Sequence, residues 1–341
     1  MTGKKEMRVL LLSLFATLGI VGLAVWSFRD VIASSIAPQQ SRQATSSIDT
    51  PSSPVERFSQ VQNVPNGTFN YGGSTTWATI RGTVDLEIQK ARPEFRLNYV
   101  QQDGVAPSTQ SGIELLTQGK TAFSLASRLP SNEVLQTLAS QGIQLKLIPV
   151  ASSFDVVAVN PSLPVSSITL DQINAIRSGS ITNWRQIGGP DLPIQQFDRD
   201  VNSDMIEARS TANSNLQTLT TPLELIRKVA ETPGSFAVVA APLAVPQCTV
   251  KVLAIATTPN QTITPYKEPL ISSPQCFSQR NQVNLAAFAS GAYPSELKNT
   301  LYVVIKQNGQ LEQQVGETYA NFLLSDEGQS LLEKAGYLRI R

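Results

Sequence analysis

Residues 68–100 read TFNYGGSTTWATIRGTVDLEIQKARPEFRLNYV, and this stretch predicts a strand, a loop, a helix and a second strand. Residues 68–71 and 96–100 carry β-forming side chains, and Gly72-Gly73 is followed by two hydroxyl residues that can cap a helix. The helix has one apolar stripe with spacings of three and four: Trp77, Ile80, Val84, Ile88 and Ala91. A strand–helix–strand unit is typical of an α/β sheet covered by helices.

The same alternation continues along the chain. Further strands are expected at 121–126, 145–150, 154–159, 193–198, 236–240, 250–255 and 301–306. Helices are expected after Ser131, Thr169 and Thr221, where a capping residue precedes the apolar positions, and at 281–290 and 311–334. The pattern therefore predicts the α/β fold class.

Composition excludes much enzyme chemistry. The chain of 341 residues suits two lobes, and its 41% hydrophobic content can fill their cores. It has no histidine and two cysteines, which removes imidazole bases, Ser-His-Asp triads and four-cysteine zinc sites. Lys plus Arg is 27 and Asp plus Glu is 26, and this near-neutral balance disfavours nucleic acid as a partner. We expect no cofactor and no metal.

The N-terminus predicts export or anchoring. Lys4, Lys5 and Arg8 precede an uncharged run of 20 residues from 9 to 28, which is about 30 Å long as a helix and can span a bilayer. The flanking charges place the rest of the chain outside the cytoplasm. Residues 1–30 are thus a signal anchor or a signal peptide, and we favour the uncleaved membrane anchor because a cleaved signal has a shorter apolar run.

Residues 31–65 are rich in Ser, Gln, Thr and Pro and predict a flexible linker between that segment and the globular part. Export also bears on Cys248 and Cys276, because an oxidising compartment permits a disulfide between them. The alternative is two unrelated buried thiols.

Three loops end a strand and open a helix with hydroxyl or guanidinium side chains. They are 72–76, 108–112 and 199–203. A helix N-terminus presents unpaired backbone N–H groups, and hydroxyls or an arginine beside it build a site for an oxyanion. Each loop alone is also ordinary turn and cap chemistry, so the three together carry the prediction.

At these loops the chain resembles the PstS-like phosphate-binding proteins of ABC importers, over about residues 69–341. Gly73-Ser74-Thr75-Thr76 is similar to the first anion loop of that family, and residues 119–129 are similar to its G-x-x-D-x-x-x-A-S-R-x-L stretch. Residues 169–184, which include Gly179-Ser180-Ile181-Thr182-Asn183-Trp184, resemble its most specific segment. Residues 325–337 resemble its closing helix.

The resemblance implies a type II periplasmic-binding-protein fold with two α/β lobes, the ligand lying between them. Residues 66–152 and 262–341 would form lobe one, and residues 153–261 lobe two. The residues expected to bind the ligand are Ser74, Thr75, Thr109, Ser111, Ser127 and Arg128 in lobe one, and Arg199 and Ser203 in lobe two.

The chain departs from the family pattern in both lobes. In lobe one, Ala122 replaces the common Asp, and Thr109-Gln110-Ser111-Gly112 differs from G-S-G-T-G. Ser203-Asp204-Met205 stands where the family has S-G-T, and a carboxylate at Asp204 would repel a dianion if it pointed inward. Asn183 and Trp184 are expected to be structural, with the indole in the lobe-two core and the amide capping a turn.

The function predicted is capture of phosphate outside the cytoplasm by a monomeric receptor, in the periplasm or at the outer face of the membrane, for delivery to an ABC permease. The alternative is a membrane-tethered module of the same fold that senses or binds another oxyanion or small polar ligand. A third hypothesis, an enzyme, rests on Ser295-Glu296-Leu297-Lys298, which matches S-x-x-K. Because the companion S-D-N and K-T-G motifs are absent from the sequence, we expect no catalytic residue.

Overall fold

The structure is a computed structural model that describes residues 55–199, 215–258, 260–271 and 273–340. Ser53–Arg341 form one compact unit. The predicted anchor at 1–30 and the linker up to residue 54 lie outside the described residues. Among the residues that are described, no helix is both long enough and apolar enough to cross a membrane.

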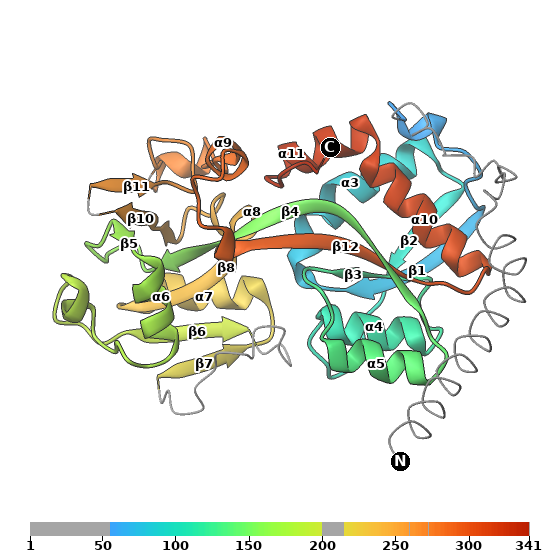
Figure 1. Cartoon of the computed structure of the whole chain (residues 1–341). Coiled ribbons are helices and arrows are strands. Elements are labelled where there is room, and N and C mark those ends of the chain that lie inside the picture. The colour runs from blue at the N-terminus through green and yellow to red at the C-terminus, as the bar shows by residue number, and fades with distance from the viewer. Residues whose placement is uncertain (1–54, 200–214, 259, 272, 341) are drawn as a thin grey trace, which may run out of the picture. The chain divides into compact units, whose positions relative to one another are not determined.

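The described residues fold into two α/β lobes, each around its own apolar core, as the sequence predicts (Figure 1). The first lobe contains β1 (Gly67–Gly73), α3 (Ala78–Ala91), β2 (Phe95–Tyr99), α4 (Thr109–Thr117), β3 (Phe123–Ala126), α5 (Asn132–Ser140), α10 (Leu311–Leu324) and α11 (Asp326–Lys334). The second lobe contains β5 (Ser167–Ile168), α6 (Leu170–Arg177), β6 (Gln195–Arg199), β7 (Leu216–Leu219), α7 (Pro222–Glu231), β8 (Ser235–Ala240), α8 (Ala241–Ala244), β9 (Lys251–Val252), β10 (Ala254–Thr258), β11 (Gln261–Ile263) and α9 (Leu285–Ala289).

Two strands cross between the lobes, β4 (Leu145–Val159) and β12 (Lys298–Lys306). They pair antiparallel from Lys298 opposite Phe154 to Lys306 opposite Leu145, and Figure 1 shows them side by side. Through them the strands join in the order β2-β1-β3-β12-β4-β8-β6-β7, with β9 also paired to β4, among the described residues. The sequence predicts two strands where the structure has the single strand β4, because the small residues 151–153 interrupt the pattern of β-forming side chains. In the structure these residues still pair with β12.

The two cores divide the chain at the crossing strands. The first core takes residues from Phe58 to Ala151 and from Leu301 to Tyr337. The second takes residues from Phe154 to Leu297, and these include Val283, Phe288, Tyr293 and Leu297. The family resemblance predicts residues 262–297 in the first lobe, whereas their buried side chains pack in the second core.

The end of the predicted linker is ordered against the first lobe, which corrects that prediction for residues 55–65. Phe58 is fully buried and lies edge-on to Phe322, with ring centroids 5.7 Å apart. The backbone N–H of Phe58 donates to Glu327 at 2.8 Å, and the N–H of Glu327 donates to the carbonyl of Glu56 at 2.9 Å. Phe58 and Val61 are buried in the first core, and Val55 and Val64 pack partly buried against it, so apolar contacts anchor this otherwise polar segment.

The residues expected to be structural in the second lobe have that role. Trp184 is fully buried, and its indole N–H donates to the carbonyl of Gly234 at 3.0 Å. The side-chain oxygen of Asn183 accepts from the N–H of Arg185 at 2.9 Å and caps the short turn that follows.

Candidate functional site

A cavity of about 70 Å³ lies between the lobes and has room for a few water molecules or a small anion. We call it the interlobe cavity. Its polar lining is Thr76, Ser127, Arg128, Asp155, Asp198, Arg199 and Asn299. Its apolar lining includes Leu225, Val238, Val239 and Leu243 from the second lobe, and these side chains lower the local dielectric constant, which strengthens electrostatic interactions in the site.

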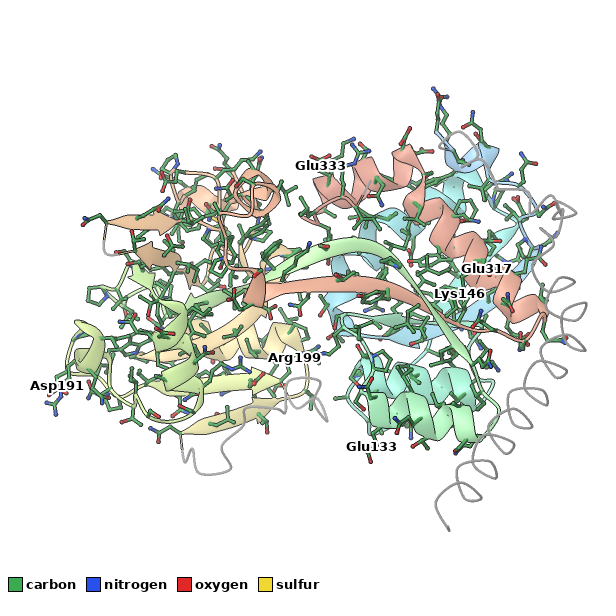
Figure 2. All side chains as sticks on the ribbon, viewed as in Figure 1. Glu133, Lys146, Asp191, Arg199, Glu317 and Glu333 are labelled. Carbon is green, nitrogen blue, oxygen red and sulfur yellow. A yellow bond between two sulfur atoms is a disulfide. The ribbon has the colours of Figure 1, made fainter. Side chains whose placement is uncertain are left out.

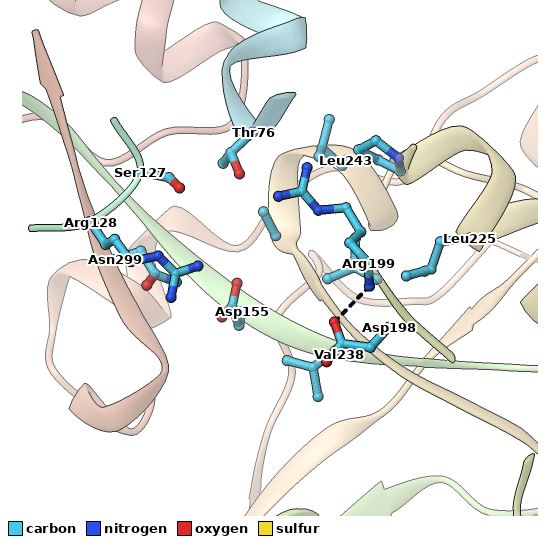
Figure 3. Close-up of a pocket in the computed structure, with 13 residues that line it drawn as sticks. Thr76, Ser127, Arg128, Asp155, Asp198, Arg199, Leu225, Val238, Leu243 and Asn299 are labelled. Carbon is cyan, nitrogen blue, oxygen red and sulfur yellow. Dashed lines mark hydrogen bonds between the residues drawn. The ribbon is translucent and has the colours of Figure 1, made fainter. Parts of the chain in front are cut away.

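Two guanidinium groups reach the interlobe cavity from different lobes. Arg128 follows the end of β3 in the first lobe, and Arg199 is the last residue of β6 in the second. Figure 3 shows both side chains extending into the cavity from opposite sides, and Figure 2 places Arg199 where the second lobe faces the first. Strand ends of an open α/β sheet are the usual place for ligand-binding residues, so the fold itself positions these two arginines.

Ser127 is held in place by two other residues that are predicted from the sequence to bind the ligand. Ser74, fully buried, donates its hydroxyl to Oγ of Ser127 at 3.0 Å. Thr109 accepts the backbone N–H of Ser127 on its Oγ1 at 3.2 Å. Two of the three predicted loops, 72–76 and 108–112, are therefore joined through Ser127 in the first lobe. Ser74 and Thr109 act through Ser127, and neither lines the interlobe cavity.

Two carboxyl groups that were not predicted from the sequence line the same cavity. Asp155 lies on β4, and burial raises its pKa, while the side chain of Asn299 and the charge of Arg128 oppose that rise. Asp198 precedes Arg199 on β6, and its Oδ1 accepts the N–H of Arg199 at 2.7 Å (Figure 3). The site thus offers cationic donors, hydroxyl groups and carboxylate acceptors together.

The remaining predicted residues lie elsewhere. Thr75 lines a different, adjoining cavity. Ser111 is the third residue of α4, and its hydroxyl accepts the N–H of Ser108 at 2.8 Å while Ser108 accepts the N–H of Ser111 at 3.1 Å. This reciprocal capping box commits Ser111 to the helix end. Ser203, with the altered loop around Asp204, lies outside the described residues.

The cavity residues that were not predicted differ in how visible they are in the sequence. Asp155 is a charged residue inside the apolar run at 154–159, and a charge in such a run is a recognisable signal of a functional site. Thr76 ends the Gly73-Ser74-Thr75-Thr76 loop. Asn299 carries no local signal, because only the pairing of β12 with β4 brings it beside the cavity.

Two predictions outside the cavity can also be placed. Cys248 and Cys276 form a disulfide with Cα atoms 5.4 Å apart, which confirms that prediction. Ser295 lies on an exposed turn, where its hydroxyl donates to the carboxylate of Glu296 at 3.3 Å. It lines none of the cavities found in the described part of the chain.

Comparison with known proteins supports the fold. The family model described as the PBP superfamily domain matches residues 59–327. The phosphate-binding protein PstS of Borreliella burgdorferi is 26% identical over 132 residues, which are 39% of this chain and 43% of that protein. Protein SphX of Synechococcus elongatus is 30% identical over 131 residues, which are 37% of each chain.

The chain spans less than half the length of these two relatives in the matched regions. Among solved structures, a phosphate ABC transporter substrate-binding protein with bound phosphate from Clostridium perfringens has a TM-score of 0.60. It is 19% identical, and the match covers 81% of this chain and 100% of that one. At this identity the likeness concerns the fold.

Proposed function

This chain belongs to the PBP superfamily, and from that premise we propose that it captures inorganic phosphate in the interlobe cavity. The proposal rests on one observation above others, the convergence of Arg128 and Arg199 from separate lobes on one small cavity with the hydroxyls of Ser127 and Thr76. Guanidinium groups donate charge-assisted hydrogen bonds that match phosphate oxygens in geometry. Binding of this kind needs no catalytic group.

The two carboxyls favour an anion that carries a proton. With Arg128, Arg199, Asp155 and Asp198 all ionised, the charges that line the interlobe cavity sum to zero. A protonated phosphate can donate its O–H to a carboxylate, whereas sulfate at neutral pH has no proton to donate and would meet only repulsion there. Phosphate is therefore the oxyanion that this donor and acceptor set fits best.

The role that we propose is delivery of phosphate to an ABC-type permease from the outer face of the cytoplasmic membrane. In this proposal residues 1–30 anchor the chain. The globular part divides at the crossing strands, with residues 55–152 and 298–340 in one lobe and 153–297 in the other. The resemblance to PstS-like proteins supports this assignment.

Isothermal titration calorimetry of the full chain in mild detergent tests the binding step, after bound ligand is removed by unfolding and refolding. Phosphate should bind, and Arg199→Ala should weaken it about ten- to a hundredfold, since a hydrogen bond to a charged group contributes about 1.5–3 kcal/mol. Arg185→Gln is the matched control, because it removes an exposed arginine of the same lobe whose ion pair is with Asp191.

Sulfate gives the second arm of the same titration. The wild-type chain should prefer phosphate, and Asp155→Asn should reduce that preference because the amide no longer repels an unprotonated anion. A folded chain that binds neither anion would refute the proposal, as would an Arg199→Ala variant that binds phosphate as tightly as the control.

A further inference from the structure

A second cavity adjoins the interlobe cavity, and we call it the Tyr99 cavity. It measures about 350 Å³, and its lining includes Thr75, Arg81, Tyr99, Gln102, Thr220 and Thr221. Thr75 is followed in the chain by Thr76, and Thr221 by Pro222, both of which line the interlobe cavity. In each lobe, therefore, one residue lines the Tyr99 cavity and the next residue in the chain lines the interlobe cavity. The two cavities thus adjoin each other in both lobes.

The Tyr99 cavity contains polar atoms that the described residues leave unsatisfied. Oγ1 of Thr75, Nε of Arg81 and Oε1 of Gln102 are buried and have no hydrogen-bond partner among the described residues. Thr75 as a whole is 8% exposed. A buried polar group without a partner is destabilising and is rare in proteins, so three of them in one cavity indicate that a polar ligand or ordered water completes the site.

The charged group in this cavity is fixed in position by an aromatic ring. The guanidinium carbon of Arg81 lies 3.6 Å from the ring centroid of Tyr99. The hydroxyl of Tyr99 in turn donates to the carbonyl of Gly73 at 2.7 Å, which ties the ring to the loop that precedes Thr75. Stacking on the ring leaves the edge of the guanidinium available for hydrogen bonds in its plane.

The charge of the Tyr99 cavity differs from that of its neighbour. Arg81 is its one charged lining residue among the described residues, so the lining carries a charge of about +1 where the interlobe lining sums to zero. The nearest acid on the same helix, Asp85, is directed to the hydroxyls of Tyr71 and Tyr319 and does not line the cavity. An anionic group is the complement of this arrangement.

We propose that the Tyr99 cavity receives the second phosphoryl group of a diphosphate whose first phosphoryl group occupies the interlobe cavity. Arg81 and the hydroxyl of Thr75 donate to oxygens of the second group, and Oε1 of Gln102 accepts from a protonated oxygen of that group. The inference rests on the proposed function, because it takes the interlobe cavity as the phosphate site. It also gives Thr75 a role that differs from the one expected for it from the sequence.

Competition calorimetry on the full chain in mild detergent tests this assignment, with inorganic phosphate, pyrophosphate and glycerol 3-phosphate as ligands. Pyrophosphate should bind and should displace phosphate. Arg81→Gln should weaken pyrophosphate about ten- to a hundredfold, and phosphate less than about twofold. Lys90→Gln is the matched control, since it removes one positive charge from an exposed position of the same helix.

Gln102→Leu is a second variant that keeps the size of the side chain and removes its amide, so it too should weaken pyrophosphate selectively. Thermal unfolding of each variant shows that it is folded. The assignment is overturned if phosphate binds and pyrophosphate does not, or if Arg81→Gln weakens both ligands equally. Glycerol 3-phosphate that binds as well as pyrophosphate, and is insensitive to Arg81→Gln, would also overturn it. Failure of the wild-type chain to bind phosphate would overturn the proposed function and this inference together.

Discussion

Asp85 is a buried carboxyl group in the first lobe whose ionisation opposes folding. It is 3% exposed, and its oxygens accept hydrogen bonds from the hydroxyls of Tyr71 at 2.6 Å and Tyr319 at 2.7 Å. Burial is the largest influence and raises the pKa of Asp85 from 3.8 to about 6, although the two hydroxyls and the charge of Arg81 act in the opposite direction. The folded chain therefore holds this proton more tightly than the unfolded chain does.

The sign of the effect on stability follows from that difference. Between the two pKa values the folded state binds the proton and the unfolded state does not, so the free energy of unfolding falls as the pH rises. One pKa unit is worth about 1.36 kcal/mol, and the loss from this group between about pH 4.5 and about pH 7.5 comes to about 2 kcal/mol. Its contribution is complete at acid pH and is gone above about pH 6.

The substitution Asp85→Asn isolates this term because the amide has nearly the same shape and never ionises. The amide oxygen accepts from one tyrosine, and the amide N–H donates to the other. Urea unfolding of wild type and variant at both pH values gives two stability differences, in which the other titrating groups cancel. The difference should change by about 2 kcal/mol in favour of the variant on going from acid to neutral pH.

Glu312→Gln, which neutralises an exposed carboxyl on α10, is the matched control for removal of a negative charge. A stability difference between wild type and Asp85→Asn that is the same at the two pH values would refute the reasoning, because it would mean that burial does not hold the proton on Asp85.

Two further predictions concern the disulfide and the cap of α4. Replacing both Cys248 and Cys276 by Ala should lower the free energy of unfolding by about 3–4 kcal/mol, because the disulfide closes a loop with a sequence separation of 28 and so restricts the unfolded chain. Urea unfolding measures this loss, and a value below about 1 kcal/mol would contradict the prediction. Ser111→Ala should lower the free energy of unfolding by about 1 kcal/mol, because the hydrogen bond to Ser108 is lost, and should leave the affinity for phosphate unchanged in calorimetry. A large loss of affinity would instead show that Ser111 binds the ligand, as the sequence resemblance implies.

Local sequence patterns predicted helices well where the hydrogen bond that starts the helix joins residues within one helical turn. Ser131, Thr169 and Thr221 each precede a helix in the structure, and each accepts the N–H of the third residue after it. A cap of this kind depends on residues three apart, so the sequence contains both partners. The alternation of strands and helices follows for the same reason.

Contacts between distant segments were not predictable in this way. Residues 55–65 look like linker because their composition is polar, and the partner that orders them, Glu327, lies 269 residues further along the chain from Phe58. The assignment of residues 262–297 to the first lobe failed similarly, since nothing local shows that Phe288 and Tyr293 pack against Phe154 of β4 in the second core.

In the candidate site, the hydrogen-bond donors were predictable from the sequence and the carboxylate acceptors were not. Ser127, Arg128 and Arg199 were expected because hydroxyl and guanidinium donors at strand ends suit an oxyanion, and they do line the interlobe cavity. Asp155 and Asp198 were not expected, because carboxylates do not donate hydrogen bonds to an anion and are not part of such a pattern. Yet the acids determine what the cavity can select. A lining whose charges sum to zero attracts anions weakly through its net field, so affinity must come from donors that are fixed in direction. The carboxylates then discriminate by requiring a proton on the ligand.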